Sequence, residues 1–254
     1  RLQRKDNTLE VVYKDNTKKS IPVERVNDIY IMTEFDFNTS LLNFLGQNGI
    51  QIHYYNYYGF YTGTFYPKEQ LVSGKLLVKQ VDAYTNKEKR VYLAKAFIEA
   101  ASYNIYRNLV YYKNRGKNVE EHMKEIDSLR KQILKCKDVP ELMGIEGNIR
   151  KIYYSAWNEI INQDIAFEKR VKNPPDNAIN SLISYVNSVI YTRVLSEIYK
   201  TQLNPTISYL HEPSERRFSL CLDIAEIFKP IIADRLIFSM LNKKHCRQQL
   251  IIKR

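Results

Sequence analysis

The first third of the chain alternates short apolar segments with polar breaks, a pattern typical of β-strands. The segments are rich in β-branched and aromatic residues, and we expect strands at 9–13, 21–23, 29–32, 50–54 and 61–66. Between them, Leu41, Leu42 and Leu45 would share one helical face, and Asn38 or Thr39 can cap the helix. The pattern therefore predicts a short helix over 37–46 within a β-rich region.

From about residue 76 the apolar positions recur at helical spacing instead. This spacing predicts a long helix ending near Gly116, a charged helix over 119–137, and further helices over 145–167, from Asp176 or Asn177 to 200, and from Ser214 or Glu215 to 242. The last helix contains Pro230, and a proline inside a helix removes a backbone donor, so we expect an interruption there.

The glycines divide the chain in the same place. Five of the eight lie at or before Gly74, and none follows Gly147. Glycine supplies the positive φ angles that tight turns need, so a long stretch without glycine favours helices over hairpins. The fold class we predict is α+β, with a small β-rich domain over 1–74 followed by a larger all-α domain over 75–254.

The charge follows this division. The net charge of +11 splits into +2 over residues 1–80 and +9 over residues 81–254. A basic surface combined with 20 tyrosines is typical of a nucleic-acid binder, although exposed helices also carry lysine simply for solubility. We expect any polyanion to meet mainly the helical domain.

Several classes of protein are excluded or disfavoured. No apolar run approaches the roughly 20 residues that span a bilayer, and no signal peptide is visible after Arg1. The three cysteines show no paired spacing, so we expect a reducing, cytoplasmic location. The signatures of P-loop nucleotide hydrolases, Rossmann dehydrogenases, α/β-hydrolases and HExxH metalloproteases are missing from the sequence.

Two acidic segments are the strongest candidates for chemistry. Asp223 and Glu226 are three residues apart and would be neighbours on a helix, with His211 in a loop just upstream. Two such carboxylates repel each other unless they are exposed or joined by a cation, which a divalent metal or Lys229 can supply. By itself this spacing is common on solvated helix faces.

The second acidic segment places Glu146 between Gly144 and Gly147, at the start of a predicted helix. Glycines allow close backbone approach and a helix N-terminus favours anions. Taken alone, the segment is better explained by a capping carboxylate in the first turn.

Together these segments resemble one known family. Gly144-Ile145-Glu146-Gly147, Tyr154, Arg170, Pro174-Pro175, Asn180, Leu210-His211-Glu212, the run from Leu222 to Pro230 and Asp234-Arg235 occur in the order found in the CRISPR adaptation integrases ("Cas one"). Segments near the start, 2–9 and 56–65, are also similar to this family. The resemblance covers nearly the whole chain, and the ordered set is specific although each motif alone is weak.

The resemblance implies a β-sandwich-like N-terminal domain that forms a homodimer and an α-helical catalytic domain. Carried over by motif, Glu146, His211 and Glu226 are the implied catalytic residues and ligands of Mn²⁺ or Mg²⁺, with Asp223 as an auxiliary ligand. The implied partners are DNA, as spacer precursor and CRISPR repeat, and a small second CRISPR-associated protein ("Cas two"). For phosphate contacts our candidates are the basic residues Arg170, Lys229, Arg216, Arg217 and Lys151, which surface solvation explains equally well.

Three functions stay open at this point. The first is a metal-dependent integrase that joins the 3′-hydroxyls of spacer DNA to the CRISPR repeat by transesterification, for which carboxylate and imidazole ligands are suited. The second is a metal-dependent nuclease that cuts branched DNA without integration. The third is a non-catalytic nucleic-acid-binding scaffold whose acidic cluster is structural.

Overall fold

The computed structural model covers residues 1–254 and describes all of them except 35, 69–70, 163–166, 173, 216–217 and 244–254. The chain divides into two compact units, Arg1–Val72 and Ser73–Arg254. The division falls two residues before the predicted end of the β-rich domain at residue 74. Counted by these units, the first carries 8 basic and 8 acidic residues, so the whole net charge of +11 belongs to the second.

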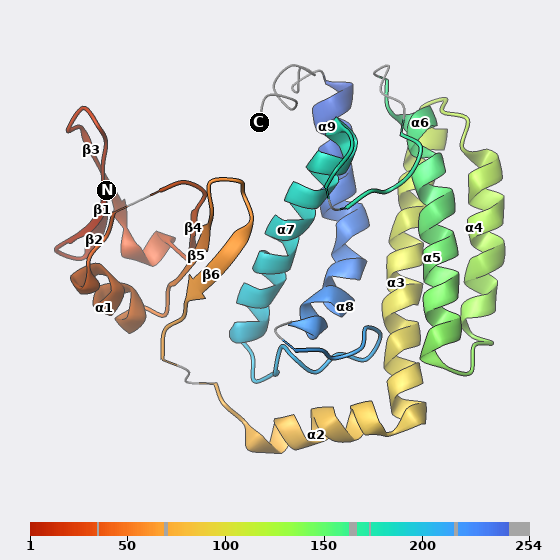
Figure 1. Ribbon diagram of the computed structural model, residues 1–254, viewed down its shortest axis with the longest axis horizontal. Helices are drawn as coiled ribbons and strands as arrows, with labels where there is room; N and C mark the ends of the chain where they lie inside the picture. The colour runs from red at the N-terminus through yellow and green to blue at the C-terminus, as the bar shows by residue number, and fades with distance from the viewer. Residues whose placement is uncertain (35, 69–70, 163–166, 173, 216–217, 244–254) are drawn as a thin grey trace. The chain divides into compact units, whose positions relative to one another are not determined.

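Among its described residues, the first unit contains two three-stranded sheets, one α-helix and a short 3-10 helix, η1 (Val23–Arg25) (Figure 1). In the first sheet β1 (Leu2–Lys5), β2 (Thr8–Val12) and β3 (Lys18–Pro22) are antiparallel. In the second, β4 (Asp28–Ile31) runs parallel to β5 (Gln51–Tyr55), and β6 (Tyr61–Phe65) is antiparallel to β5. Helix α1 (Thr39–Gln47) makes the crossover that the parallel pair requires.

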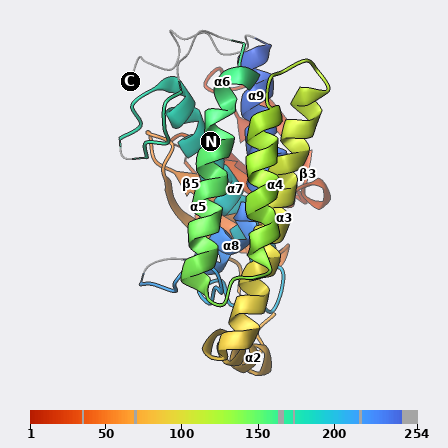
Figure 2. The same ribbon diagram turned by 90° about the vertical axis from the view of Figure 1, so that its right-hand side faces the viewer.

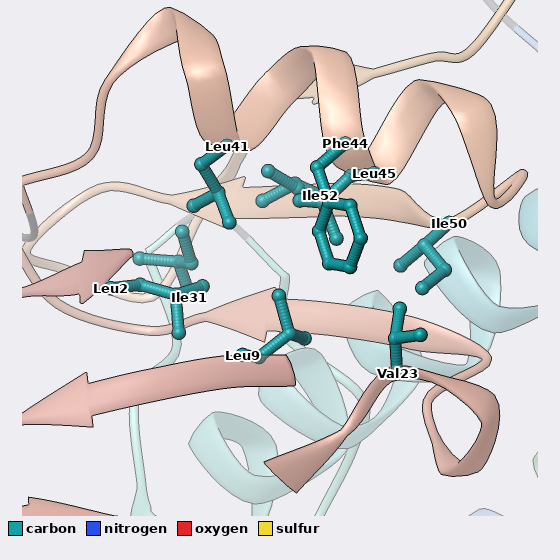
Figure 3. Close-up of a cluster of buried hydrophobic side chains, with 9 residues drawn as sticks. All are labelled: Leu2, Leu9, Val23, Ile31, Leu41, Phe44, Leu45, Ile50 and Ile52. Atoms are coloured by element: carbon teal, nitrogen blue, oxygen red, sulfur yellow. The ribbon is translucent and has the colours of Figure 1, made fainter. Parts of the chain in front are cut away.

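One apolar cluster holds this unit together (Figure 3). Leu41, Phe44 and Leu45 project from one face of α1, and all three are buried. They face Leu9 and Ile52 of the two sheets, so the cluster joins the helix and both sheets. Asn38 caps α1, as predicted, by accepting a hydrogen bond from the backbone N–H of Leu41.

The second unit is helical (Figure 1, Figure 2). Its helices are α2 (Gly74–Thr85), α3 (Lys87–Lys113), α4 (Glu120–Ile133), α5 (Val139–Ser155), α6 (Trp157–Ile160), α7 (Ala178–Tyr199), α8 (Ser219–Phe228) and α9 (Arg235–Asn242), with a π-helical segment η2 (Lys229–Asp234) between the last two. The predicted α+β fold class is confirmed.

Three predicted helix boundaries are wrong. Helix α5 begins at Val139, not at residue 145, because Asp138 accepts a hydrogen bond from the Glu141 N–H and Pro140 suits the first turn. It ends at Ser155, well before residue 167. Helix α8 begins at Ser219, about one turn after the predicted start.

The predicted interruption at Pro230 takes the form of η2. Proline cannot continue the ordinary hydrogen-bond ladder, and a π-helical turn is a way of accommodating it. Asn108 and Asn104 of α3 donate their side-chain amides to the carbonyls of Pro230 (2.6 Å) and Ile227 (2.9 Å). Helix α3 therefore satisfies carbonyls that the irregular turn exposes and fixes the end of α8.

A buried aromatic cluster lies at the C-terminal end of α5. Trp157 is fully buried, with its ring centroid 6.0 Å from Tyr153, 5.5 Å from Phe167 and 4.6 Å from Phe238 of α9. These contacts hold α5, α6 and α9 together. Over the part of the chain that the structure describes, no helix is long and apolar enough to cross a membrane.

Candidate active site

Glu146 lies inside α5 and not at its start. The helix begins seven residues earlier, so the expectation of a capping carboxylate at a helix N-terminus is wrong. The side chain is 21% exposed, and its Oε1 accepts a hydrogen bond from Arg150 Nε at 3.1 Å. A Cβ added at Gly144 or Gly147 would meet nothing within 4 Å, so the glycines leave open space beside Glu146.

Glu226 of α8 is the second carboxylate on the same guanidinium. Its Oε2 accepts from Arg150 Nη2, while its Oε1 accepts from Lys229 Nζ at 2.5 Å. All three side chains are nearly buried, at 10–12% exposure. One cation from α5 therefore joins carboxylates from two helices that are distant in sequence, and Lys229 supplies a second positive charge.

The balance of burial and charge sets the protonation of this cluster. Burial by itself would raise the pKa of Glu226, but the charges of Arg150 and Lys229 outweigh it and lower the pKa to about 2. Burial would likewise lower the pKa of Lys229, yet Glu226 keeps it above the ordinary value. Glu226 is thus an ionised carboxylate at neutral pH.

Asp223 is fully buried one turn before Glu226 and organises the loop that carries His211. Its Oδ2 accepts from the backbone N–H groups of Tyr209 (2.7 Å) and Leu210 (2.9 Å). Its Oδ1 accepts from the His211 N–H (3.0 Å) and lies 2.8 Å from His211 Nδ1. A carboxylate on Nδ1 fixes the imidazole ring and leaves Nε2 as the ligand atom.

The contacts of Asp223 are those of a residue that positions the His211 loop, whereas the family resemblance implies an auxiliary metal ligand. Both of its oxygens are engaged by the loop, so in this structure it positions His211 as an outer-shell carboxylate does. Its role as an auxiliary metal ligand stays a prediction, as do the roles of Glu146, His211 and Glu226.

The basic residues expected to contact DNA have different surroundings. Arg170 is half-buried, and its guanidinium donates to Asn180 Oδ1 (3.0 Å) and Ser184 Oγ (2.8 Å), which holds the preceding segment against α7. Lys229 is buried against Glu226, whereas Lys151 is exposed on α5. Arg216 and Arg217 lie outside the described residues.

Two members of the site were missed from the sequence. Arg150 follows Glu146 by four residues on a helix, a spacing that pairs opposite charges and was available as a signal. Asp234 is fully buried, and its Oδ2 has no hydrogen-bond partner among the described residues. Burial raises the pKa of Asp234 to about 6, against the opposing effect of Arg150. Nothing in the sequence distinguishes Asp234 as buried.

The arrangement has the donors for a divalent metal without being assembled around one. Within the described residues, no three His, Cys, Asp or Glu side chains form a group that could hold a metal ion. However, the Arg150 guanidinium contacts both Glu146 and Glu226, and so marks a position where two carboxylates share one cation. Carboxylate oxygens and imidazole nitrogen together suit Mn²⁺, and carboxylates suit Mg²⁺. The donor set fits the predicted metal.

Comparison with known proteins decides the family. Residues 1–253 match the family model of the CRISPR associated protein Cas1. The chain belongs to the Cas1 family. A relative from Fusobacterium nucleatum, named CRISPR-associated endonuclease Cas1, is 61% identical over 252 residues, which are 99% of this chain and 75% of the relative. A relative of the same name from Pyrococcus horikoshii is 44% identical over 98% of this chain and 76% of its own length.

Solved structures agree with this assignment. The structure of a Cas1 protein from Thermotoga maritima has a TM-score of 0.84 at 42% identity and covers 98% of this chain and 78% of that one. A casposase bound to its integration product has a TM-score of 0.81 over 98% of this chain and 72% of that one. At 20% identity, the casposase shows a shared fold alone. The prediction of the family, and of an enzyme family whose relatives are named endonucleases, is confirmed.

The charge cluster predicts a pH-dependent stability difference. Glu226→Gln leaves Arg150 and Lys229 buried without their shared counter-charge, so we expect the free energy of unfolding to fall by about 3–5 kcal/mol at pH 7. The folded pKa of Glu226 lies below its ordinary value of 4.5, so its stabilisation is present above pH 4.5 and is lost as pH falls towards 2. The measurement is urea unfolding followed by Trp157 fluorescence at pH 7 and pH 3. The difference in free energy of unfolding between wild type and Glu226→Gln should be smaller at pH 3 than at pH 7.

The matched control for this change is Glu125→Gln on the exposed face of α4, which should alter stability by less than about 0.5 kcal/mol at either pH. A gap between wild type and Glu226→Gln that is equally large at both pH values would contradict the assignment of Glu226 as the ionised partner of two cations.

A separate prediction concerns the His211 loop. Asp223→Asn removes the charge and presents an amide to the N–H donors of Tyr209, Leu210 and His211, so these backbone amides should lose protection from hydrogen exchange. We expect a stability loss of about 2–4 kcal/mol, as for other buried charge-assisted hydrogen bonds. Asp127→Asn, which breaks a surface ion pair on α4, should change stability little, because exposed ion pairs are screened by solvent, and should leave the loop amides protected. Unchanged exchange in Asp223→Asn would refute the role of Asp223 as loop anchor.

Proposed function

We propose that this chain is a divalent-metal-dependent DNA integrase of CRISPR adaptation, joining 3′-hydroxyl ends of spacer DNA to the CRISPR repeat. The observation that carries the proposal is the convergence of Glu146 of α5 and Glu226 of α8 on one cation, in a helical unit that holds all of the net positive charge. The relatives named CRISPR-associated endonuclease Cas1 support the same class of phosphoryl transfer.

Charge balance explains how a metal would enter this site. In the structure, the two carboxylates are neutralised by Arg150 and Lys229. A divalent ion held by Glu146, Glu226 and the Nε2 of His211 would take over that neutralisation. The two side-chain cations would then be available to the phosphate oxygens of DNA, which is the partner that an excess of positive charge requires.

When bound, Mn²⁺ or Mg²⁺ supplies a Lewis acid that polarises the phosphoryl oxygen and lowers the pKa of the attacking hydroxyl. The chain's own residues do the positioning. Asp223 fixes the His211 ring through Nδ1, and Arg150 holds Glu146 and Glu226 to one point before the ion arrives. Transesterification breaks one phosphodiester bond and forms another, so no protein nucleophile is needed.

Hydrolysis is the second candidate, because the relatives are named endonucleases. The same site would then activate water in place of a DNA 3′-hydroxyl. We also propose from family membership that the chain forms a homodimer through its N-terminal unit and works with the small second CRISPR-associated protein.

A joining assay separates these candidates. With a labelled duplex carrying free 3′-hydroxyls, a repeat-containing target and Mn²⁺, we expect joined product with wild type. Glu146→Gln and His211→Ala should reduce its rate by at least about 100-fold, since each removes a ligand of the ion that stabilises the transition state. Glu125→Gln on exposed α4 should join at the wild-type rate.

A donor with 3′-dideoxy ends and addition of EDTA serve as further controls, and both should abolish joining. Cut but unjoined target with wild type would favour the nuclease. Joining that is unaffected by both Glu146→Gln and His211→Ala would rule out this site as the catalytic centre. Neither joined nor cut target with wild type would favour the scaffold.

A further inference from the structure

A basic pocket lies in the helical unit, built from residues that the proposed catalytic site does not use. It has a volume of about 630 Å³. It lies between the C-terminal end of α3, Asn162 just after α6, and α9. Its lining includes Tyr111, Tyr112, Arg115, Lys117, Arg235 and Lys243. The ends of α6 and α9 lie towards the top in both views (Figure 1, Figure 2).

The pocket carries a positive charge that its own walls do not neutralise. Four of its lining residues are cations, and none of the described lining residues is a carboxylate. The partners of two of these cations are neutral: Lys117 Nζ donates to Asn162 Oδ1 at 2.5 Å and Arg235 Nε to Asn108 Oδ1 at 2.7 Å. Burial raises the pKa of Tyr112 to about 12, so its hydroxyl adds no negative charge at neutral pH.

Helix dipoles account for only part of this charge. The C-terminal ends of α3 and α9 both meet the pocket, and each contributes roughly half of one negative charge. Together they match about one of the four cations. The remainder favours an anionic ligand, because like charges gathered in a concave surface repel one another unless a counter-charge enters.

Aromatic surface lies beside the cations. Tyr111 is 49% exposed, and the Arg115 guanidinium lies over its ring with 3.8 Å from Cζ to the centroid. Its ring is also edge-on to Tyr112, at 5.1 Å between centroids. An exposed ring paired with a guanidinium plane offers a stacking surface for a base next to donors for its phosphate. The volume is within the range of small-ligand pockets of roughly 300–1,000 Å³.

We propose that this pocket binds an unpaired nucleotide of a DNA strand, with its base stacked on the Tyr111–Arg115 pair and its phosphates held by Arg115, Lys117 and Lys243. This inference rests on the proposed function only in taking DNA as the ligand. Asn108 of α3 links this pocket to α5. It accepts a hydrogen bond from Arg235 and donates one to Tyr153 Oη of α5 (3.1 Å), so the pocket is connected to the helix that carries Glu146 and Arg150.

The test is fluorescence anisotropy of the full chain with labelled pentathymidylate and with a strand of equal length in which every sugar lacks its base. Tyr111→Leu should bind pentathymidylate at least about 5-fold more weakly, the lower limit for loss of one stacked base, and the abasic strand as wild type does. Tyr92→Leu is the matched control, since Tyr92 is exposed on the same helix and lies outside the pocket.

The phosphate contacts are tested by salt dependence. Arg115→Gln with Lys117→Gln should weaken binding of both strands and reduce the slope of log affinity against log salt by about 1.4, for two single-strand phosphate contacts. Lys124→Gln on the exposed face of α4 with Lys135→Gln, two residues after the end of α4, makes the same change in net charge and should leave the slope as in wild type. Trp157 fluorescence of each variant checks that it is folded.

The inference is overturned if Tyr111→Leu binds as Tyr92→Leu does, or if the two double variants have the same slope. Equal weakening of Tyr111→Leu on normal and abasic strands would also overturn base stacking. The joining assay keeps the two proposals apart: if Glu146→Gln abolishes joining while the pocket variants bind normally, only the pocket inference fails. If the pocket variants bind weakly while Glu146→Gln joins normally, only the proposed function fails.

Discussion

The constraint on which the candidate site depends is the sharing of one guanidinium by two carboxylates from different helices. Arg150 contacts Glu146 four residues earlier on α5 and Glu226 across the interface on α8. Buried charges are tolerated only when they are paired and hydrogen-bonded, so these side chains hold α5 and α8 in register as well as neutralising one another. Lys229 completes the balance with a second cation on Glu226.

The rest of the helical unit supports that arrangement. Asn104 and Asn108 of α3 bind the carbonyls of Ile227 and Pro230, which fixes the end of α8 next to Glu226 and Lys229. Asp223, one turn earlier on α8, binds three consecutive backbone N–H groups and the His211 ring. A single helix thus presents one carboxylate to the cation cluster and a second to the histidine loop.

Much of this was accessible from the sequence, because it depends on local signals. Five of the eight glycines lie at or before Gly74, close to the division between the β-rich unit and the helices. Asn38 and Asn177, each one of two predicted caps, cap α1 and α7. The start of α5 was misplaced because Asp138 and Pro140 form a better N-terminus than the glycines around Glu146 do. The candidate residues came from the family resemblance, since Asp-x-x-Glu on a helix is too common to identify a site by itself.

What could not be predicted is the pairing between distant elements. No local signal shows that Arg150 reaches Glu226, that Asp223 faces the loop before α8, or that Asp234 is buried with one unpartnered oxygen. The basic pocket at the ends of α3 and α9 is of the same kind, because Arg115 and Arg235 come together only through helix packing. These contacts depend on tertiary structure, and they decide which charges are exposed to a ligand and which are neutralised inside the protein.

The central claim is that Glu146 and Glu226 share one cation position that a divalent metal can occupy. Titration with Mn²⁺, followed by the loss of the free-ion electron paramagnetic resonance signal, tests it most directly. The account predicts one bound Mn²⁺ per wild-type chain and binding at least about 10-fold weaker in Glu146→Gln and in Glu226→Gln, with Glu125→Gln unchanged. Wild-type affinity in both glutamine variants of the site would contradict it.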